Sequence, residues 1–152
     1  MLYQTLKRIL DMLGATIGLA LMVPFTPLIA LAIKLDSRGP VFVRLPRVSQ
    51  AKLVHIWKFR SMVDGAHAMK AELAHLNERT DGPFFKIRND PRLTRVGRIL
   101  RKFRIDEFPQ LINVLTGELA LVGPRPHEPE EVARYPKEYE LLPRLKAGVT
   151  GL

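Results

Sequence analysis

The longest uncharged stretch of the chain is residues 12–33, MLGATIGLALMVPFTPLIALAI, which contains no Asp, Glu, Lys or Arg. Its length suits a membrane helix, because about 20 apolar residues cross a bilayer core of ~30 Å. Pro24 and Pro27 lie near its middle. Each proline removes a backbone donor and forces a helix to kink or break. We therefore expect two half-helices of roughly 15–18 Å each, about half a bilayer.

The charges on either side of this stretch indicate how it meets the membrane. Lys7 and Arg8 precede it, and Lys34 and Arg38 follow it. Such cations favour the cytoplasmic side of a membrane. Both flanks can stay there only if the chain enters and leaves through one leaflet, so residues 1–38 are interpreted as a re-entrant membrane helix with its flanks. The alternative is a transmembrane helix with a proline kink, whose freed backbone groups are satisfied by neighbouring helices.

The rest of the chain has the composition of a basic folded domain. The 152 residues include 24 Lys and Arg against 15 Asp and Glu, a formal net charge of +9, and no Cys. The lack of Cys excludes disulfides, Cys-ligated metal sites and a thiol nucleophile. The charge favours anionic partners such as nucleic acid, lipid headgroups or phosphorylated small molecules. We expect residues 39–152 to form a small, mostly helical α+β domain in the cytosol.

Local patterns predict the elements of this domain. Short strands are expected at residues 41–43 and 53–57, separated by a polar connection through Pro46 and Ser49. A helix is expected after Asp64, with apolar residues at helical spacing from Ala66 to Leu76.

The second half of the domain is expected to be helical at first and irregular later. The turn residues at 80–83 predict a break, and helices are expected at about 93–103 and 106–115. Prolines at 124, 126 and 129 predict no regular structure after Val122.

Arginine recurs at every third position from Arg92 to Arg104, through positions 95, 98 and 101. This spacing winds slowly around a helix, so not all five side chains can face one partner. One interpretation is a helix that faces solvent or lipid headgroups. The other is that one or two of these guanidinium groups clamp a diphosphate.

An acidic pair, Asp106 and Glu107, follows this basic stretch directly, with Pro109 close behind. Taken alone, the pair is an ordinary arrangement at a helix N-terminus. Among so many cations it could also be catalytic. An ionised Asp can attack phosphorus, and a neighbouring carboxylate can hold Mg²⁺ together with substrate phosphate oxygens.

Two further segments could contact phosphate. In residues 122–126, VGPRP, Arg125 stands between two prolines that stiffen the loop. In residues 58–60, KFR, Lys58 and Arg60 flank an aromatic residue. The alternatives are a plain surface turn and a basic strand end. The four histidines have no zinc-site spacing.

Four segments, in this order, resemble the bacterial sugar transferase family, the monotopic polyprenyl-phosphate phosphoglycosyl transferases. They are residues 58–62 (KFRSM), 90–98 (DPRLTRVGR), 106–115 (DEFPQLINVL) and 122–126 (VGPRP). Residues 33–42 (IKLDSRGPVF) also resemble the segment that follows the membrane helix of the family.

The resemblance implies an enzyme at the cytoplasmic face of the bacterial inner membrane. It would transfer a sugar-1-phosphate from a UDP-sugar to undecaprenyl phosphate, with Mg²⁺, and so initiate exopolysaccharide, capsule or O-antigen assembly. Carried over to this chain, Asp106 is the nucleophile that expels UMP and Glu107 positions the metal. Substrate phosphate is expected to bind five cations in or between these segments: Lys58, Arg60, Arg92, Arg101 and Arg125.

The resemblance also shows where the chain departs from the family pattern. Val23 stands where Ser usually precedes the central proline, and the Thr26 hydroxyl could take over the backbone hydrogen bond of that Ser. Family members usually continue past the position of Leu152 through a helical segment that completes the nucleotide-sugar pocket, so residues 39–152 are interpreted as a catalytic core without it.

Two rival functions remain open from the sequence. One is a basic, membrane-tethered nucleic-acid-binding protein, although the acidic pair would repel a polyanion, so no nucleic acid is expected as a partner. The other is an inactive scaffold of a glycan assembly complex. A homodimer is left open, and no residue identifies the sugar.

Overall fold

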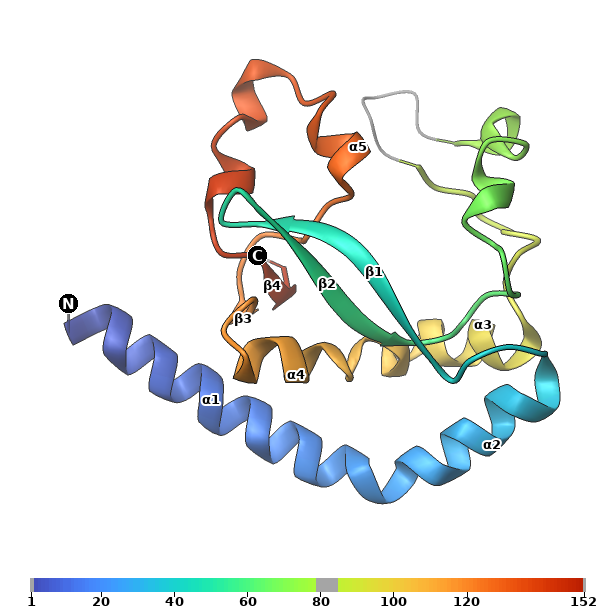
Figure 1. Ribbon diagram of the computed structural model, residues 1–152, viewed down its shortest axis with the longest axis horizontal. Helices are drawn as coiled ribbons and strands as arrows, with labels where there is room; N and C mark the ends of the chain where they lie inside the picture. Colours follow the sequence, from blue (N-terminus) through green and yellow to red (C-terminus); the bar gives the residue numbers. More distant parts are fainter. Residues whose placement is uncertain (1, 79–84, 152) are drawn as a thin grey trace.

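The computed structural model describes residues 2–78 and 85–151. Helix α1 (Leu2–Met22), a 3₁₀ turn (Val23–Phe25) and helix α2 (Thr26–Asp36) form one long N-terminal element. Figure 1 shows α1 and α2 meeting at an open angle, with the rest of the chain on one side of them. Pro24 lies in the 3₁₀ turn, and the Thr26 hydroxyl donates to the Met22 carbonyl at 3.2 Å.

This N-terminal element is long and apolar enough, by length and composition, to cross a membrane. Large apolar side chains are exposed along its whole length, among them Leu6, Leu13, Ile17, Leu21, Phe25, Leu28 and Leu31. Its placement in a bilayer, as a re-entrant hairpin or as a span, stays a prediction.

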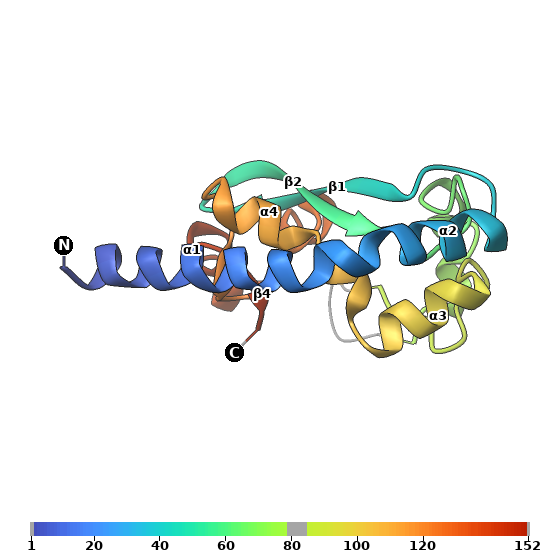
Figure 2. The same cartoon turned by 90° about the horizontal axis from the view of Figure 1, so that it is seen from below.

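Hydrogen bonds join the N-terminal element to the remainder near both of its ends. Near its start, the Arg8 guanidinium donates to the carbonyls of Val114 and Leu115 at 2.5 and 2.8 Å. At its end, the Asp36 carboxylate accepts from the Val96 N–H at 2.8 Å. Seen from below, the element crosses the molecule between α3 and α4 (Figure 2). The apolar N-terminal element and the cationic remainder of the chain are therefore connected directly.

A long antiparallel hairpin follows, formed by β1 (Phe42–Ser49) and β2 (Lys52–Phe59). The expected polar connection was wrong, because Pro46 and Ser49 both lie inside β1. Pro46 is tolerated there because β1 is an edge strand that pairs only with β2. The turn consists of Gln50 and Ala51, whose φ values of 52° and 56° suit the tight turns that join twisted strands.

The segment after the hairpin differs from the sequence prediction. Instead of one helix after Asp64, the structure has two short 3₁₀ turns, Ala68–Lys70 and Ala74–Leu76. Ala66 is buried, but Leu76 is 41% exposed. The apolar positions therefore share no buried face, and an isolated helix of this length is only marginally stable in water. The break expected at residues 80–83 lies outside the described residues.

Helix α3 (Arg95–Lys102) confirms the helix expected at 93–103, beginning two residues later. The Thr94 hydroxyl caps it by accepting from the Gly97 N–H at 2.9 Å. The second expected helix is divided into a 3₁₀ turn (Ile105–Glu107) and helix α4 (Gln110–Leu115).

Regular structure continues after Val122, against the prediction. Strand β3 (Ala120–Val122) pairs in parallel with β4 (Gly148–Thr150). Helix α5 (Pro129–Val132) begins at a proline, which the first helical position accepts because its N–H would have no helical partner. Two 3₁₀ turns, Lys137–Tyr139 and Leu142–Arg144, connect α5 to β4.

Two small hydrophobic clusters support this mixed arrangement of helices and strands. The larger one joins the hairpin, α4, β3 and α1, and its buried members include Val54, Ile56, Leu111, Val114, Leu119 and Ala15. The smaller one packs Phe59 of β2 against Ile33 of α2 and Leu100 of α3. The acidic turn at 105–107 connects the two clusters, because Ile105 packs against the smaller one and Phe108, just after the turn, packs against the larger one.

Candidate active site

The acidic pair lies in the 3₁₀ turn that leads into α4. Asp106 is buried, with 4% of its surface exposed, and Glu107 is partly buried. Arg104, just before the turn, has a left-handed backbone with φ of 56°. This conformation reverses the chain after α3 and directs it into the acidic segment.

Lys58 of β2 pairs with this turn. Its ammonium group donates to Glu107 Oε1 at 2.9 Å, and the two side chains are 15% and 17% exposed. Side chains two residues apart point to the same face of a strand, so Lys58 follows the buried Val54 and Ile56. The inward face of β2 thus changes from apolar to cationic where it reaches the acidic pair.

The two adjacent carboxyls are shifted in opposite directions. Burial raises the pKa of Asp106, and repulsion from Glu107 adds to this, whereas Lys58 and Arg101 oppose it. Burial also acts to raise the pKa of Glu107, but attraction and a hydrogen bond from Lys58, with help from Arg125 and Arg104, lower it overall. Pairs of titratable groups whose environments separate their pKa values are typical of catalytic sites.

The cations of the site interact with one another as well as with the acids. Burial lowers the pKa of Lys58, although Glu107 and Asp106 attract its charge. Burial also lowers the pKa of Arg101, which donates from Nε to the Ser61 hydroxyl at 2.9 Å. The charge of the exposed Arg125 acts on Glu107, Lys58 and Arg101. The structure therefore brings together Lys58, Arg101, Asp106, Glu107 and Arg125 of the seven predicted catalytic and phosphate-binding residues, and the charge of Arg92 also acts on Arg101.

The other two predicted phosphate-binding residues hold the fold together instead. Arg60 is 4% exposed and donates to carbonyl groups at the end of α2, at 2.8 Å to Ser37 and 3.4 Å to Ile33, and also to Arg38. Arg92 is 6% exposed and forms a bidentate pair with Asp90, at 2.9 and 2.7 Å. Most of their guanidinium donors bond within the protein, although Arg60 Nε is buried without a hydrogen-bond partner among the described residues, and the role of either residue in binding phosphate stays a prediction.

Asn113 of α4 positions the site and was missed from the sequence. It is 1% exposed, and its Oδ1 accepts from the Trp57 N–H at 2.9 Å while its Nδ2 donates to the His55 carbonyl at 2.9 Å. These bonds satisfy the outer edge of β2 and hold α4 against the strand that carries Lys58. An amide between the apolar residues Ile112 and Val114 was the signal that could have revealed it.

A divalent cation would have few protein ligands here. Among residues 2–78 and 85–151, no three His, Asp or Glu side chains cluster closely enough to hold a metal ion. Asp106 and Glu107 offer two adjacent carboxyls. Mg²⁺ is commonly held by one or two carboxylates together with substrate phosphate oxygens, so the donor set fits an ion that the substrate helps to bind.

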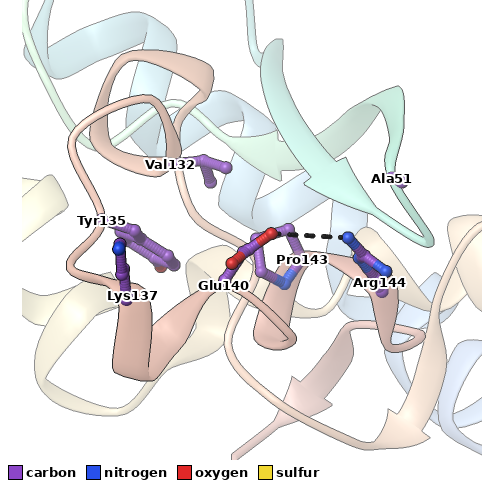
Figure 3. A pocket seen from close by; sticks show the side chains of 7 residues that line it. All are labelled: Ala51, Val132, Tyr135, Lys137, Glu140, Pro143 and Arg144. Atoms are coloured by element: carbon purple, nitrogen blue, oxygen red, sulfur yellow. Dashed lines mark hydrogen bonds and ion pairs between the residues drawn. The ribbon is translucent and has the colours of Figure 1, made fainter.

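Two small cavities are lined mainly by the C-terminal part of the chain. One of about 200 Å³ has Arg125 in its wall, together with His127 and Tyr135. The other, of about 320 Å³, has Tyr135, Lys137 and Arg144 in its wall (Figure 3). Neither cavity includes the acidic pair in its wall.

Comparison with known proteins gives consistent matches over nearly the whole chain. The model of a family described as "Bacterial sugar transferase" matches residues 2–152. The chain is 41% identical over 152 residues to an undecaprenyl-phosphate glucose phosphotransferase of Komagataeibacter xylinus, covering 95% of this chain. It is 41% identical over 150 residues to a UDP-glucose:undecaprenyl-phosphate glucose-1-phosphate transferase of Escherichia coli K12, covering 96% of this chain.

The relatives differ in length from this chain. The alignments cover 26% of the Komagataeibacter protein and 30% of the Escherichia protein. An exopolysaccharide production protein of Rhizobium leguminosarum, 38% identical over 154 residues, is covered to 72%. The chain thus spans about a quarter to a third of the first two relatives and most of the third.

Proposed function

The chain belongs to the bacterial sugar transferase family, and from this premise we propose that it transfers a sugar-1-phosphate from a UDP-sugar to undecaprenyl phosphate. The product would initiate the assembly of an exopolysaccharide or a related glycan. The observation that carries the proposal is the buried Asp106 beside Glu107, with the charges of Lys58, Arg101 and Arg125 acting on the pair.

In the first step, an oxygen of the ionised Asp106 carboxylate attacks the phosphorus that bears the sugar. A bond forms between the carboxylate oxygen and phosphorus, and the bond from that phosphorus to the bridging oxygen of the diphosphate breaks. UMP leaves with the bridging oxygen and its electron pair. The result is an aspartyl phosphosugar, and no proton needs to be transferred.

In the second step, a phosphate oxygen of undecaprenyl phosphate attacks the same phosphorus. The bond between phosphorus and Asp106 breaks, so that the carboxylate is restored, and the sugar is now joined to the lipid through a diphosphate. The atoms and charges balance again without a proton. Splitting one transfer into two displacements is the purpose of a covalent nucleophile.

The charges around Asp106 support this role. A nucleophile must be ionised, and Lys58 and Arg101 favour the ionised form of a carboxyl whose pKa burial raises. The same cations, with Arg125, would offset the repulsion between the carboxylate and the incoming diphosphate. Lys58 has both tasks, because it also keeps Glu107 ionised through a 2.9 Å hydrogen bond.

The fold is compatible with Mg²⁺ at this position. Glu107 would hold the ion, through the oxygen that Lys58 does not bind, together with phosphate oxygens of the substrate. When bound, the ion would supply neutralisation of the charge on the diphosphate.

The N-terminal element supports an acceptor that stays in the membrane. We infer that residues 1–38 enter and leave the cytoplasmic leaflet of the bacterial inner membrane and that residues 39–152 lie on its cytosolic side. The bonds from Arg8 and Asp36 join the apolar element directly to α4 and α3, on either side of the acidic turn. A lipid phosphate at the headgroup level could then reach Asp106.

The proposal is tested by UMP release from the chain reconstituted in lipid nanodiscs with Mg²⁺ and a panel of UDP-sugars. The chain should release UMP with at least one sugar and turn over repeatedly only when undecaprenyl phosphate is present. Asp106→Asn should abolish release, whereas Asp64→Asn, which alters an exposed carboxyl, should leave it unchanged. Absence of release with every sugar, or full activity of Asp106→Asn, contradicts the proposal.

A further inference from the structure

The cavity of about 200 Å³ is the feature of the molecule that the two displacement steps leave unused. Its wall includes Val48 of β1, Pro124 and Arg125 of the 122–126 loop, His127, and Tyr135 beyond α5. Arg125 connects this cavity with the acidic site, because it lines the cavity and its charge also acts on Glu107. A substrate phosphate bound by Arg125 would therefore lie at the edge of the cavity.

The wall of the cavity suits a flat ring. The rings of His127 and Tyr135 meet edge to face, with centroids 5.6 Å apart and planes at 84°. Val48 and Pro124 add aliphatic surface. Aromatic faces favour stacking with a nucleobase, and an imidazole and a phenol hydroxyl can each donate or accept hydrogen bonds at its edge.

Backbone hydrogen bonds hold this wall in place. The Val48 N–H donates to the His127 carbonyl at 3.0 Å, which ties the loop to β1. The Gly148 N–H donates to the Pro124 carbonyl at 2.9 Å, which ties it to β4. Prolines at 124 and 126 fix φ on both sides of Arg125. The cavity is thus formed before any ligand binds, which lowers the entropic cost of ordering it.

We propose that this cavity receives the base of the nucleotide-sugar donor. The inference rests on the proposed function, because it assumes that the donor phosphates lie between Arg125 and the acidic pair. A volume of about 200 Å³ is below the ~300–1,000 Å³ of pockets that enclose a drug-sized ligand. It is large enough for the base at one end of a nucleotide sugar, but not for the whole molecule.

The neighbouring cavity supplies a matched control. It shares Tyr135 with the first cavity, and Figure 3 shows Lys137, Glu140 and Arg144 along the rest of its wall. Glu140 and Arg144 form an exposed ion pair at 3.5 Å. Lys137 lines this second cavity only, so changing it alters the same region without touching the proposed base site.

The first test is equilibrium binding of UDP to the full chain in nanodiscs. Tyr135→Ala and His127→Ala should each weaken UDP binding roughly tenfold, as expected for the loss of an aromatic partner of a base. Tyr135→Phe keeps the ring and should lose much less, and Lys137→Ala should bind as the wild type does.

The second test needs no variant and so does not depend on the folding of a mutant. UDP with a photoreactive azide at carbon 5 of uracil should label the wild-type chain at the cavity wall, that is at Val48 or within residues 124–135 or 142–147. Labelling confined to other segments overturns the inference, as does equal binding of UDP by Tyr135→Ala, His127→Ala and the wild type.

The outcomes separate this inference from the proposed function. If the chain releases UMP while the variants bind UDP normally, only the base site is wrong. If the wild-type chain binds no UDP and releases no UMP, both the base site and the proposed function are wrong.

Discussion

Replacing Lys58 with methionine tests the pairing on which the acidic site depends. Methionine keeps much of the length and volume of the side chain but removes its charge and the 2.9 Å hydrogen bond to Glu107. The carboxyls of Asp106 and Glu107 would then lie in one turn without their nearest cation. We expect Lys58→Met to destabilise the fold and to impair catalysis for this single reason.

The size of the effect follows from the burial of the pair. Exposed ion pairs contribute about 0.2–1 kcal/mol, whereas removing one partner of a fully buried pair costs about 3–5 kcal/mol. The side chains of Lys58 and Glu107 are 15% and 17% exposed, nearer to the buried limit. We therefore expect a loss of about 2–3 kcal/mol in the free energy of unfolding.

The assay is denaturant unfolding of the chain in detergent micelles, followed by circular dichroism. A double-mutant cycle with Glu107→Gln isolates the pair itself, and we expect a coupling energy of about 1–2 kcal/mol. Lys52→Met is the matched control, because Lys52 is an exposed lysine of the same strand, and it should change stability by less than about 0.5 kcal/mol.

The same variant should alter the pH dependence of UMP release. Lys58 acts to lower the pKa of both Asp106 and Glu107. Without it both pKa values rise, so the acid limb of the activity profile should move to higher pH. The reasoning is refuted if Lys58→Met destabilises the chain no more than Lys52→Met does, or if the cycle gives no coupling.

Three further changes probe other parts of the molecule. Asp106→Asn should abolish UMP release yet stabilise the fold at neutral pH. Burial raises the pKa of this carboxyl in the folded chain above its ordinary value of 3.8, so ionising it destabilises the fold. The variant should therefore gain in free energy of unfolding, relative to the wild type, as the pH rises above 3.8 and through the folded pKa. Asn113→Ala leaves two backbone groups of β2 unpaired and should lower the free energy of unfolding, measured with denaturant, by about 2–4 kcal/mol. A loss below about 1 kcal/mol would contradict the role given to this buried side chain. The chain has no Cys, so single cysteines placed at Gln4 and Asp64 can be labelled with a membrane-impermeant thiol reagent in sealed vesicles. Both cysteines should react from the same side of the membrane. Protection of one of them only would argue for a transmembrane span.

Local signals in the sequence were sufficient for some parts of the fold. The uncharged stretch with its two prolines indicated an apolar N-terminal element, and the helix expected at about 93–103 is confirmed, with the Thr94 hydroxyl as its cap. The acidic pair was singled out because its neighbours along the chain are cations. In each case the residues that decide the structure are close together in the sequence.

The errors arose where distant residues decide the outcome. The hairpin turn at Gln50 and Ala51 has neither Gly nor Asn, the usual residues for positive φ, so the strands were predicted too short. The partners of Arg60 were also not visible in the sequence, because the carbonyl groups that accept from it belong to Ile33, Ser37 and Arg38, which precede it by 22 to 27 positions. Pairing across the fold, rather than residue type, determined what these side chains do.

The site depends both on residues that are neighbours in the sequence and on residues that are far apart in it. Asp106 and Glu107 are neighbours and could be recognised together, but their electrostatic partner Lys58 is 49 positions from Glu107. Proximity of these groups depends on α4 being held against β2, which Asn113 achieves through bonds to the strand backbone. No pattern in the sequence alone gives that distance.

The central claim is that Asp106 forms a covalent bond to phosphorus, and mass spectrometry of the chain tests it directly. After incubation with Mg²⁺ and the UDP-sugar that supports UMP release, and without undecaprenyl phosphate, the peptide that contains Asp106 should gain the mass of one phosphosugar. The added mass should disappear when undecaprenyl phosphate is supplied. Formation of the lipid-linked sugar without any such adduct, or an adduct on a different residue, would contradict the account.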